Sequence, residues 1–128
     1  MNNFDTTDIE DTFKGIVKGG GVTAHVYCNR PKSKEQHDDF AVVSMSLGTE
    51  DRRTFGECNV SITLFARDVA GEKNGKKLKL MYTRVLAAMP AATGRYIIDP
   101  NPLLLPDAPD DFGFHTRTID YKVTIKIQ

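Results

Sequence analysis

The sequence contains no tryptophan and only two cysteines, Cys28 and Cys58, which stand in separate strand-like runs. Small secreted proteins that depend on disulfide bonds are much richer in cysteine, so we expect both residues to be buried thiols in a reducing cytosol. Neither belongs to a C-x-x-C pair. A zinc or redox role for either cysteine is therefore not expected.

Net charge and long hydrophobic runs are missing as well. The 17 Lys and Arg residues balance the 17 Asp and Glu residues, so the formal net charge is zero. Domains that bind nucleic acid usually carry a basic excess, so no sequence-specific nucleic-acid partner is expected, and no net charge opposes self-association. Residues 1–11 are acidic and lack the apolar centre of a signal peptide. No apolar run approaches the roughly 18–20 residues that span a bilayer, which predicts a soluble, cytoplasmic protein without a membrane partner.

What the sequence does contain is ordinary for a globular domain. It has 128 residues, of which 40% are hydrophobic and 27% are charged. A chain of this size can bury a substantial core without help from metals or disulfides. We therefore expect one domain over residues 1–128.

Two amphipathic helices are indicated by apolar residues at helical spacing. In the first, one face carries residues at i, i+4, i+7 and i+8: Ile9, Phe13, Ile16 and Val17. In the second, which we expect to end at Pro90, the corresponding face carries Leu78, Met81, Val85, Leu86 and Met89. Glycines at positions 19–21 end the first helix. They favour a hinge over a phosphate-binding loop, because such a loop precedes its helix.

Five segments are predicted to be strands: residues 22–28, 40–45, 57–68, 95–99 and 112–128. The third alternates well, and Phe65 alone breaks its polar face. Its apolar face is made of Cys58, Val60, Ile62, Leu64 and Ala66. Such alternation is typical of an antiparallel strand with one buried side. The α-β-β-β-α-β-β order predicts an α+β fold, a mainly antiparallel sheet with two helices packed on one face.

The last two segments carry the least ordinary features. Residues 99–111 hold four prolines around Leu103, Leu104 and Leu105, which predicts an extended connection whose leucines pack on the body or on a partner. Within the final strand, the stretch His115–Gln128 would run about 45 Å if straight, whereas a globule of this size is about 35 Å across. It must therefore bend, bulge or reach past the body. A bend near Gly113 would form a hairpin with residues 95–99, and an overhang would form an arm for a neighbouring subunit.

One cluster could support chemistry. His37, Asp38 and Asp39 could bind a divalent metal or act in acid–base catalysis. Adjacent residues on a loop rarely point at one centre, however, so a solvated loop is the preferred interpretation. Residues 71–77 resemble a phosphate loop, but their glycines are too closely spaced and Lys77 stands where Ser or Thr should bind magnesium. No catalytic, cofactor-binding or metal-binding residue is predicted.

The order of segments resembles a known family. An N-terminal helix followed by "VYCNRP", "DDFAVVSM", "GECNVSITLFARD" and "KKLKLMYTRVLAAM", and then a long final strand, is similar to tail-completion and tail-terminator proteins of long-tailed phages. The likeness covers nearly the whole chain as a pattern of elements, apart from the proline-rich segment. It implies a subunit of a homo-oligomeric ring, commonly of six copies, at the head-proximal end of a tail, without an active site.

The resemblance also implies partners and a location. Further copies of the chain, the tail tube protein and head–tail connector proteins would be its partners, in the host cytoplasm during assembly and then in the virion. Together with the amphipathic strands, it predicts contacts with other subunits at eight residues: Arg52, Arg53, Leu103, Leu104, Phe114, Arg117, Ile119 and Tyr121. Two alternatives stay open. One is another head–tail connector or minor tail protein, and the other is a small metal-dependent enzyme that uses His37, Asp38 and Asp39.

Overall fold

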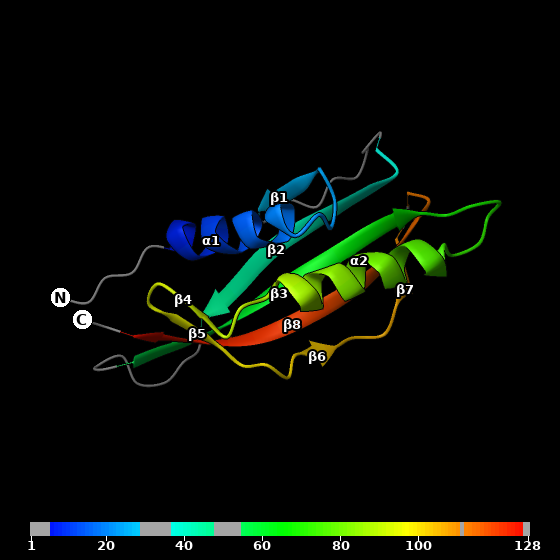
Figure 1. Ribbon diagram of the computed structural model, residues 1–128. Helices are drawn as coiled ribbons and strands as arrows, with labels where there is room; N and C mark the ends of the chain where they lie inside the picture. The colour runs from blue at the N-terminus through cyan, green and yellow to red at the C-terminus, as the bar shows by residue number, and fades with distance from the viewer. Residues whose placement is uncertain (1–5, 29–36, 48–54, 111, 127–128) are drawn as a thin grey trace.

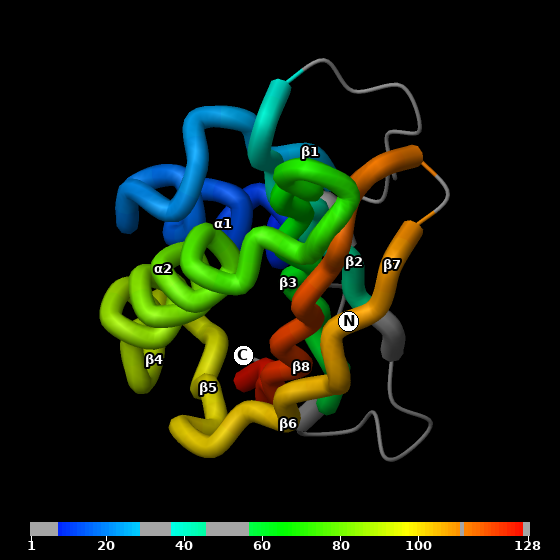
Figure 2. The backbone as a smooth tube through the Cα atoms, turned by 90° about the vertical axis from the view of Figure 1, so that its right-hand side faces the viewer, coloured from blue at the N-terminus to red at the C-terminus, as the bar shows by residue number. Residues whose placement is uncertain are grey.

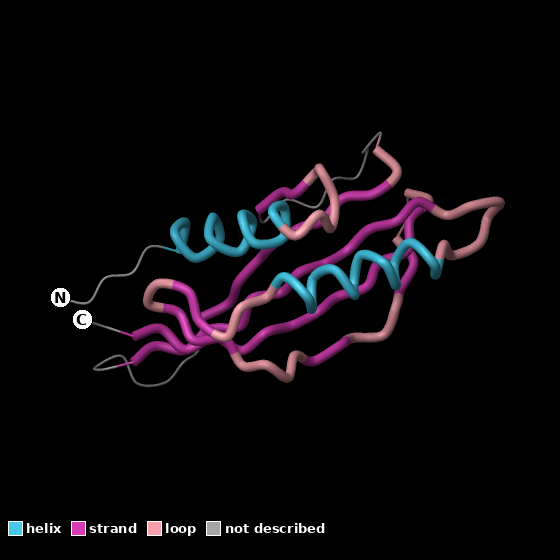
Figure 3. The backbone as a smooth tube through the Cα atoms, viewed as in Figure 1, coloured by secondary structure: helices cyan, strands magenta, loops and turns pink. Residues whose placement is uncertain are grey.

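The computed structural model describes residues 6–28, 37–47, 55–110 and 112–126. It contains two helices, α1 (Thr6–Gly19) and α2 (Gly75–Ala88), and a sheet (Figures 1 and 3). The strands are β1 (Val26–Cys28), β2 (Asp39–Leu47), β3 (Phe55–Arg67), β4 (Ala92–Thr93), β5 (Tyr96–Ile98), β6 (Leu103–Leu104), β7 (Ala108–Pro109) and β8 (Phe114–Lys126). This confirms the α+β fold. Neither helix combines the length and the apolar character that a membrane span requires.

The strands form one sheet in the order β1-β2-β3-β8-β5-β4, and β6 and β7 also pair with β8. Only the β1–β2 pair is parallel among the described strands. The sheet is therefore mainly antiparallel, as the sequence predicted. The strand expected over residues 22–28 is shorter than predicted. It starts at Val26, because Val22 and Thr23 are buried in the preceding loop, where the Thr23 hydroxyl donates a hydrogen bond to the Asp39 carboxylate.

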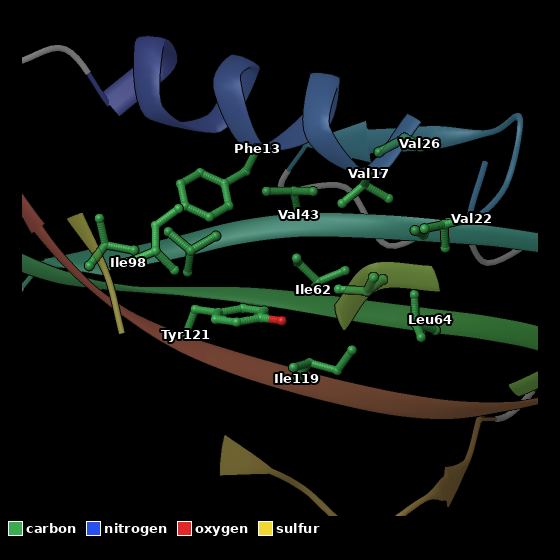
Figure 4. Close-up of a cluster of buried hydrophobic side chains, with 14 of the residues drawn as sticks. Phe13, Val17, Val22, Val26, Val43, Ile62, Leu64, Ile98, Ile119 and Tyr121 are labelled. Atoms are coloured by element: carbon green, nitrogen blue, oxygen red, sulfur yellow. The ribbon is translucent and has the colours of Figure 1, made fainter. Parts of the chain in front are cut away.

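Both helices pack on the same face of the sheet, as predicted (Figure 2). The helical residues of the resulting core are Ile9, Phe13, Val17, Leu78, Met81 and Val85. Figure 4 shows Phe13 and Val17 of α1 in one buried cluster with Ile62 of β3 and with Ile119 and Tyr121 of β8. Leu86 differs from the prediction, since 40% of it is exposed. One residue turns a helix by about 100°, so Leu86 points away from the side that Val85 buries.

The opposite face of the sheet has a small aromatic core of its own, which accounts for the irregular Phe65. The Phe65 ring stacks on Phe40 with centroids 4.2 Å apart, and Phe114 meets Phe40 edge-on at 5.4 Å. The Arg67 guanidinium carbon lies 4.5 Å from the centroid of the Phe114 ring. Phe65 therefore belongs to a second buried cluster, which also includes Val42.

The length of β8 is explained by its neighbour β3, which is equally long. It pairs with β3 without a bulge, from Phe114 opposite Arg67 to Lys126 opposite Phe55. The molecule is drawn out along these two strands (Figure 1). The expected pairing with residues 95–99 is present, because β5 pairs with β8. The strand follows a turn at Gly113, whose φ is 88°, and within the described residues it is not a free arm.

The two cysteines are free thiols. Cys58 is 2% exposed, and burial raises the pKa of its thiol to about 11. Cys28 was predicted to be buried but is only half-buried, because β1 is an edge strand. Its Sγ lies 3.8 Å from the Glu10 carbonyl oxygen of α1, and burial raises the pKa of this thiol as well.

Candidate assembly surface

The proline-rich segment lies along the edge of β8 that faces away from β3. We call residues 99–110 the strap. Its strands β6 and β7 are two residues each, and three backbone hydrogen bonds of 2.9–3.0 Å run from Asp99, Leu105 and Asp110 to carbonyl oxygens of β8. Proline cannot donate such a bond, which keeps these pairings short. The prediction of an extended connection rather than a central strand is confirmed, since the segment pairs with β8 only through two strands of two residues each.

A charged clamp holds the middle of the strap. The Arg117 Nε and Nη2 groups donate to the two carboxylate oxygens of Asp107, both at 2.8 Å, and Lys73 Nζ donates to Asp107 at 3.1 Å. The hydrogen bonds from Arg117, which outweigh the effect of burial, lower the pKa of the Asp107 carboxyl to about 2. The Arg117 guanidinium also lies over the Tyr82 ring of α2, 5.6 Å from its centroid. The strap is thereby tied to both β8 and α2.

The leucines of the strap are largely exposed. Leu103, Leu104 and Leu105 are 60%, 43% and 39% exposed, so they pack only partly on the body. Leu104 lies opposite Ile119, on the helix side of the sheet, and Leu103 lies opposite Asp120, on the other side. We call these three residues the leucine ridge. Contiguous exposed apolar residues of this kind mark sites of protein interaction.

The eight residues that the sequence predicted as subunit contacts have different environments in the structure. Phe114, Ile119 and Tyr121 are 1%, 0% and 2% exposed, so their side chains fill the two cores. Arg117 is part of the clamp, and Leu103 and Leu104 are on the leucine ridge. Arg52 and Arg53 lie outside the described residues. Among the predicted residues that the structure describes, the leucines are the ones with exposed apolar side chains.

Sequence reasoning missed Asp107 and Lys73. The available signal was a single acidic residue among prolines, on a segment that leads into a strand containing Arg117. Their meeting depends on how the strap is aligned with β8. No local pattern in the sequence gives that alignment.

A separate cleft contains His37, Asp38 and Asp39. It has a volume of about 630 Å³ and lies between the loop after α1, the start of β2 and one side of α2. The rings of His25 and His37 stack in it, with centroids 3.4 Å apart and an angle of 11° between the planes. The cleft therefore gathers polar groups from three elements.

The two carboxylates of this cleft have different cationic partners. Asp38 Oδ1 lies 3.2 Å from Arg67 Nε, whereas Asp39 Oδ2 lies 2.9 Å from Lys77 Nζ. Burial alone would raise the pKa of the Asp39 carboxyl, but hydrogen bonds from Thr23 and Lys77 lower it below its usual value. In the described part of the chain, no three His, Cys, Asp or Glu residues are grouped so that they could hold a metal ion. The geometry therefore does not bring this sequence motif together as a metal centre.

Comparison with known proteins finds a solved structure with the same fold. No family model and no curated protein matches the sequence. Among solved structures, a chain from a structure described as "Virion of native gene transfer agent (GTA) particle" matches with a TM-score of 0.59. The match covers 94% of this chain and 92% of that one at 11% identity. The two chains share a fold. At this identity the likeness concerns the fold alone, and it extends over almost the whole of both chains.

Proposed function

We propose that this protein is a structural component of a phage-like virion, of the tail-completion or tail-terminator type. In this proposal, copies of the chain form a ring at the head-proximal end of a tail. The observation that carries the proposal is the shared fold with a chain of a gene transfer agent virion, over 94% of this chain and 92% of that chain. It agrees with the resemblance in element order that the sequence shows to tail-terminator proteins.

The leucine ridge supports a role in assembly. A closed ring of identical subunits needs a contact between two different surfaces of the chain. The ridge is a suitable part of one such surface, because Leu103 and Leu104 are exposed while their backbone is held by the pairing of β6 with β8. An apolar edge that is already ordered loses little conformational entropy on binding. We assign Leu103 and Leu104 to subunit contacts, and Arg117 to holding the strap.

Partners and location follow from the same proposal. Besides other copies of the chain, they are a tail tube protein and a head–tail connector, first in the host cytoplasm and then in the virion. A different connector or minor tail protein is the second candidate, because the same fold likeness is compatible with it. The two candidates differ in where the protein binds on a tail.

Electron microscopy of tail tubes distinguishes them. The protein is labelled at its N-terminus and mixed with purified tubes. A tail terminator is expected to label one end of each tube and to stop further growth when tube protein is added. Label along the tubes, or at neither end, would contradict the proposal.

A paired substitution connects this test with the leucine ridge. Leu103→Asp is expected to abolish end labelling, and Leu80→Asp serves as the control. Leu80 is 43% exposed but lies on α2, away from the strap. Equal labelling by both variants would show that the leucine ridge is not a contact surface.

A further inference from the structure

The strap covers an edge of β8 that would otherwise be open. On this side of β8, β5 pairs only with residues 123–125, so residues 114–122 depend on the strap for a neighbour (Figure 1). A long strand with a free edge is a template on which another chain can add a strand. The strap therefore lies where pairing between copies of the sheet would begin.

The backbone of the strap alternates between facing β8 and facing away from it. Asp99, Leu105 and Asp110 donate their amides to carbonyl oxygens of β8. Leu103 is paired with β8 two residues before Leu105. Hydrogen-bonded positions alternate along an antiparallel pair, so the backbone of Leu103 also faces β8. The N–H group of Leu104, between the two, points outwards.

Prolines occupy the neighbouring outward positions. Pro102 and Pro106 directly flank Leu103 and Leu105, and Pro109 directly precedes Asp110. Adjacent residues of an extended chain direct their backbone groups to opposite sides, so the nitrogens of these three prolines face away from β8. Proline has no N–H group to offer an added strand. Between Pro102 and Pro106, the outer side therefore presents a single donor, the N–H of Leu104.

The pairing of the strap also changes register at its centre. The Leu105 amide bonds to Thr118, whereas Ala108 lies opposite Thr116. Three steps along the strap thus match two steps along β8, which makes a bulge that includes Asp107, the residue held by the clamp. A bulge interrupts the regular spacing that a further strand would need.

The apolar part of the strap is the part that the prolines enclose. The leucine ridge is a run of three exposed leucines, and Pro102 and Pro106 stand at its two ends. Prolines and charges on either side of an apolar run prevent it from pairing as a strand. The side chains of the ridge are open to a partner, whereas its backbone is not.

We infer that the strap blocks strand addition at the β8 side of the sheet, and that another copy can contact this side only through side chains. The partner that fits the leucine ridge is therefore an apolar surface of a second copy that does not extend the sheet. The inference does not depend on ring formation, because it concerns which contacts the edge excludes. It accounts for the prolines that the family resemblance left unexplained.

A double substitution, Pro102→Val with Pro106→Val, tests this inference. It adds two outward N–H groups and places strong strand formers on both sides of β6. The double variant is expected to form open assemblies, whose mass by light scattering keeps rising with concentration and which bind thioflavin T. Ala108→Val is the control, because its N–H faces β8, two residues before Asp110. It is expected to behave like the wild type.

A further substitution at Leu104 separates edge pairing from a loss of stability. Adding Leu104→Pro to the double variant removes the central outward N–H and is expected to abolish the open assemblies. Adding Leu104→Ala removes the leucine side chain but keeps the N–H, so the assemblies are expected to remain. Thermal unfolding checks that each variant folds, and Pro106→Val alone replaces the double variant if the latter does not.

Two results would overturn the inference. One is a folded double variant whose mass and thioflavin T signal equal those of the wild type. The other is an equal effect of Leu104→Pro and Leu104→Ala, which would assign the assemblies to the leucine side chain. These measurements contain no tail tubes, so either result would leave the proposed place of the protein on a tail to its own test.

Discussion

Asp107 and Arg117 form a two-point ion pair between the strap and β8, with both N–H to O distances at 2.8 Å. The Asp107 side chain is 12% exposed and the Arg117 side chain 18%, so solvent screens the pair less than it screens a surface ion pair. Because the strap carries the leucine ridge, this pair links local stability to the proposed assembly surface.

Replacing Asp107 by alanine is expected to lower the free energy of unfolding by about 1.5–3 kcal/mol, since Arg117 would lose its two charged hydrogen bonds. Urea unfolding at pH 7 measures the change. Asp38→Ala is the control, because the Asp38 side chain is 86% exposed in its pair with Arg67. Its loss is expected to stay under about 1 kcal/mol. Equal losses in the two variants would show that the clamp is no stronger than a surface pair.

Acid should weaken the same clamp. The pKa of the Asp107 carboxyl falls from 3.8 to about 2 in the fold, because Arg117 donates hydrogen bonds to the ionised form. A lowered pKa contributes stability above the unfolded-state value and loses it as the pH falls to the folded-state value. The wild type is therefore expected to lose up to about 2 kcal/mol more than Asp107→Asn between pH 4 and pH 2. Parallel pH profiles of the two proteins in this window would contradict the assignment.

Gly20 sets how closely the ends of the two helices approach. A Cβ added there would lie 2.5 Å from the Cβ of Ala88, whereas one added at Gly15 meets nothing within 4 Å. Gly20→Ala is expected to lower the free energy of unfolding by about 1–3 kcal/mol through overpacking. Gly15→Ala, in the exposed middle of α1, is expected to raise it by about 0.5–1 kcal/mol. Thermal unfolding of both variants checks the pair, and a Gly20→Ala protein as stable as the wild type would refute the close approach.

The hydroxyl of Tyr121 is buried without a hydrogen-bond partner in the described part of the chain. Burial, with Tyr82 nearby, raises the pKa of this phenol to about 12. Tyr121→Phe is expected to leave the free energy of unfolding unchanged or to raise it by up to about 1 kcal/mol, because removing an unpaired buried hydroxyl costs no bond. Tyr121→Ala should lose about 3–5 kcal/mol, because it leaves a cavity. A loss above about 1 kcal/mol in Tyr121→Phe, measured in urea, would reveal a partner for the hydroxyl.

The sequence predicted those parts of the fold that local patterns determine. Alternation identified the buried face of β3, and helical spacing identified most of the core residues of α1 and α2. The prolines correctly predicted an extended connection rather than a central strand, because they cannot donate ladder bonds.

What the sequence could not show depends on where a strand lies in the sheet. Ile119 and Tyr121 were predicted as subunit contacts on the assumption that β8 is exposed, whereas β8 lies between β3 and the strands β5, β6 and β7. Phe114 is buried because Phe40 and Phe65 come from two other strands to meet it. The clamp likewise joins segments that are distant in the sequence, since it brings Lys73 to Asp107 and Arg117.

The most direct test of the central claim is the mass of the assembled protein, measured by light scattering or native mass spectrometry with and without tail tubes. The account predicts one closed species, whose mass is a fixed multiple of the 14.2 kDa chain and does not grow as the concentration rises. A strict monomer under every condition, or an open series of ever larger oligomers, would contradict it.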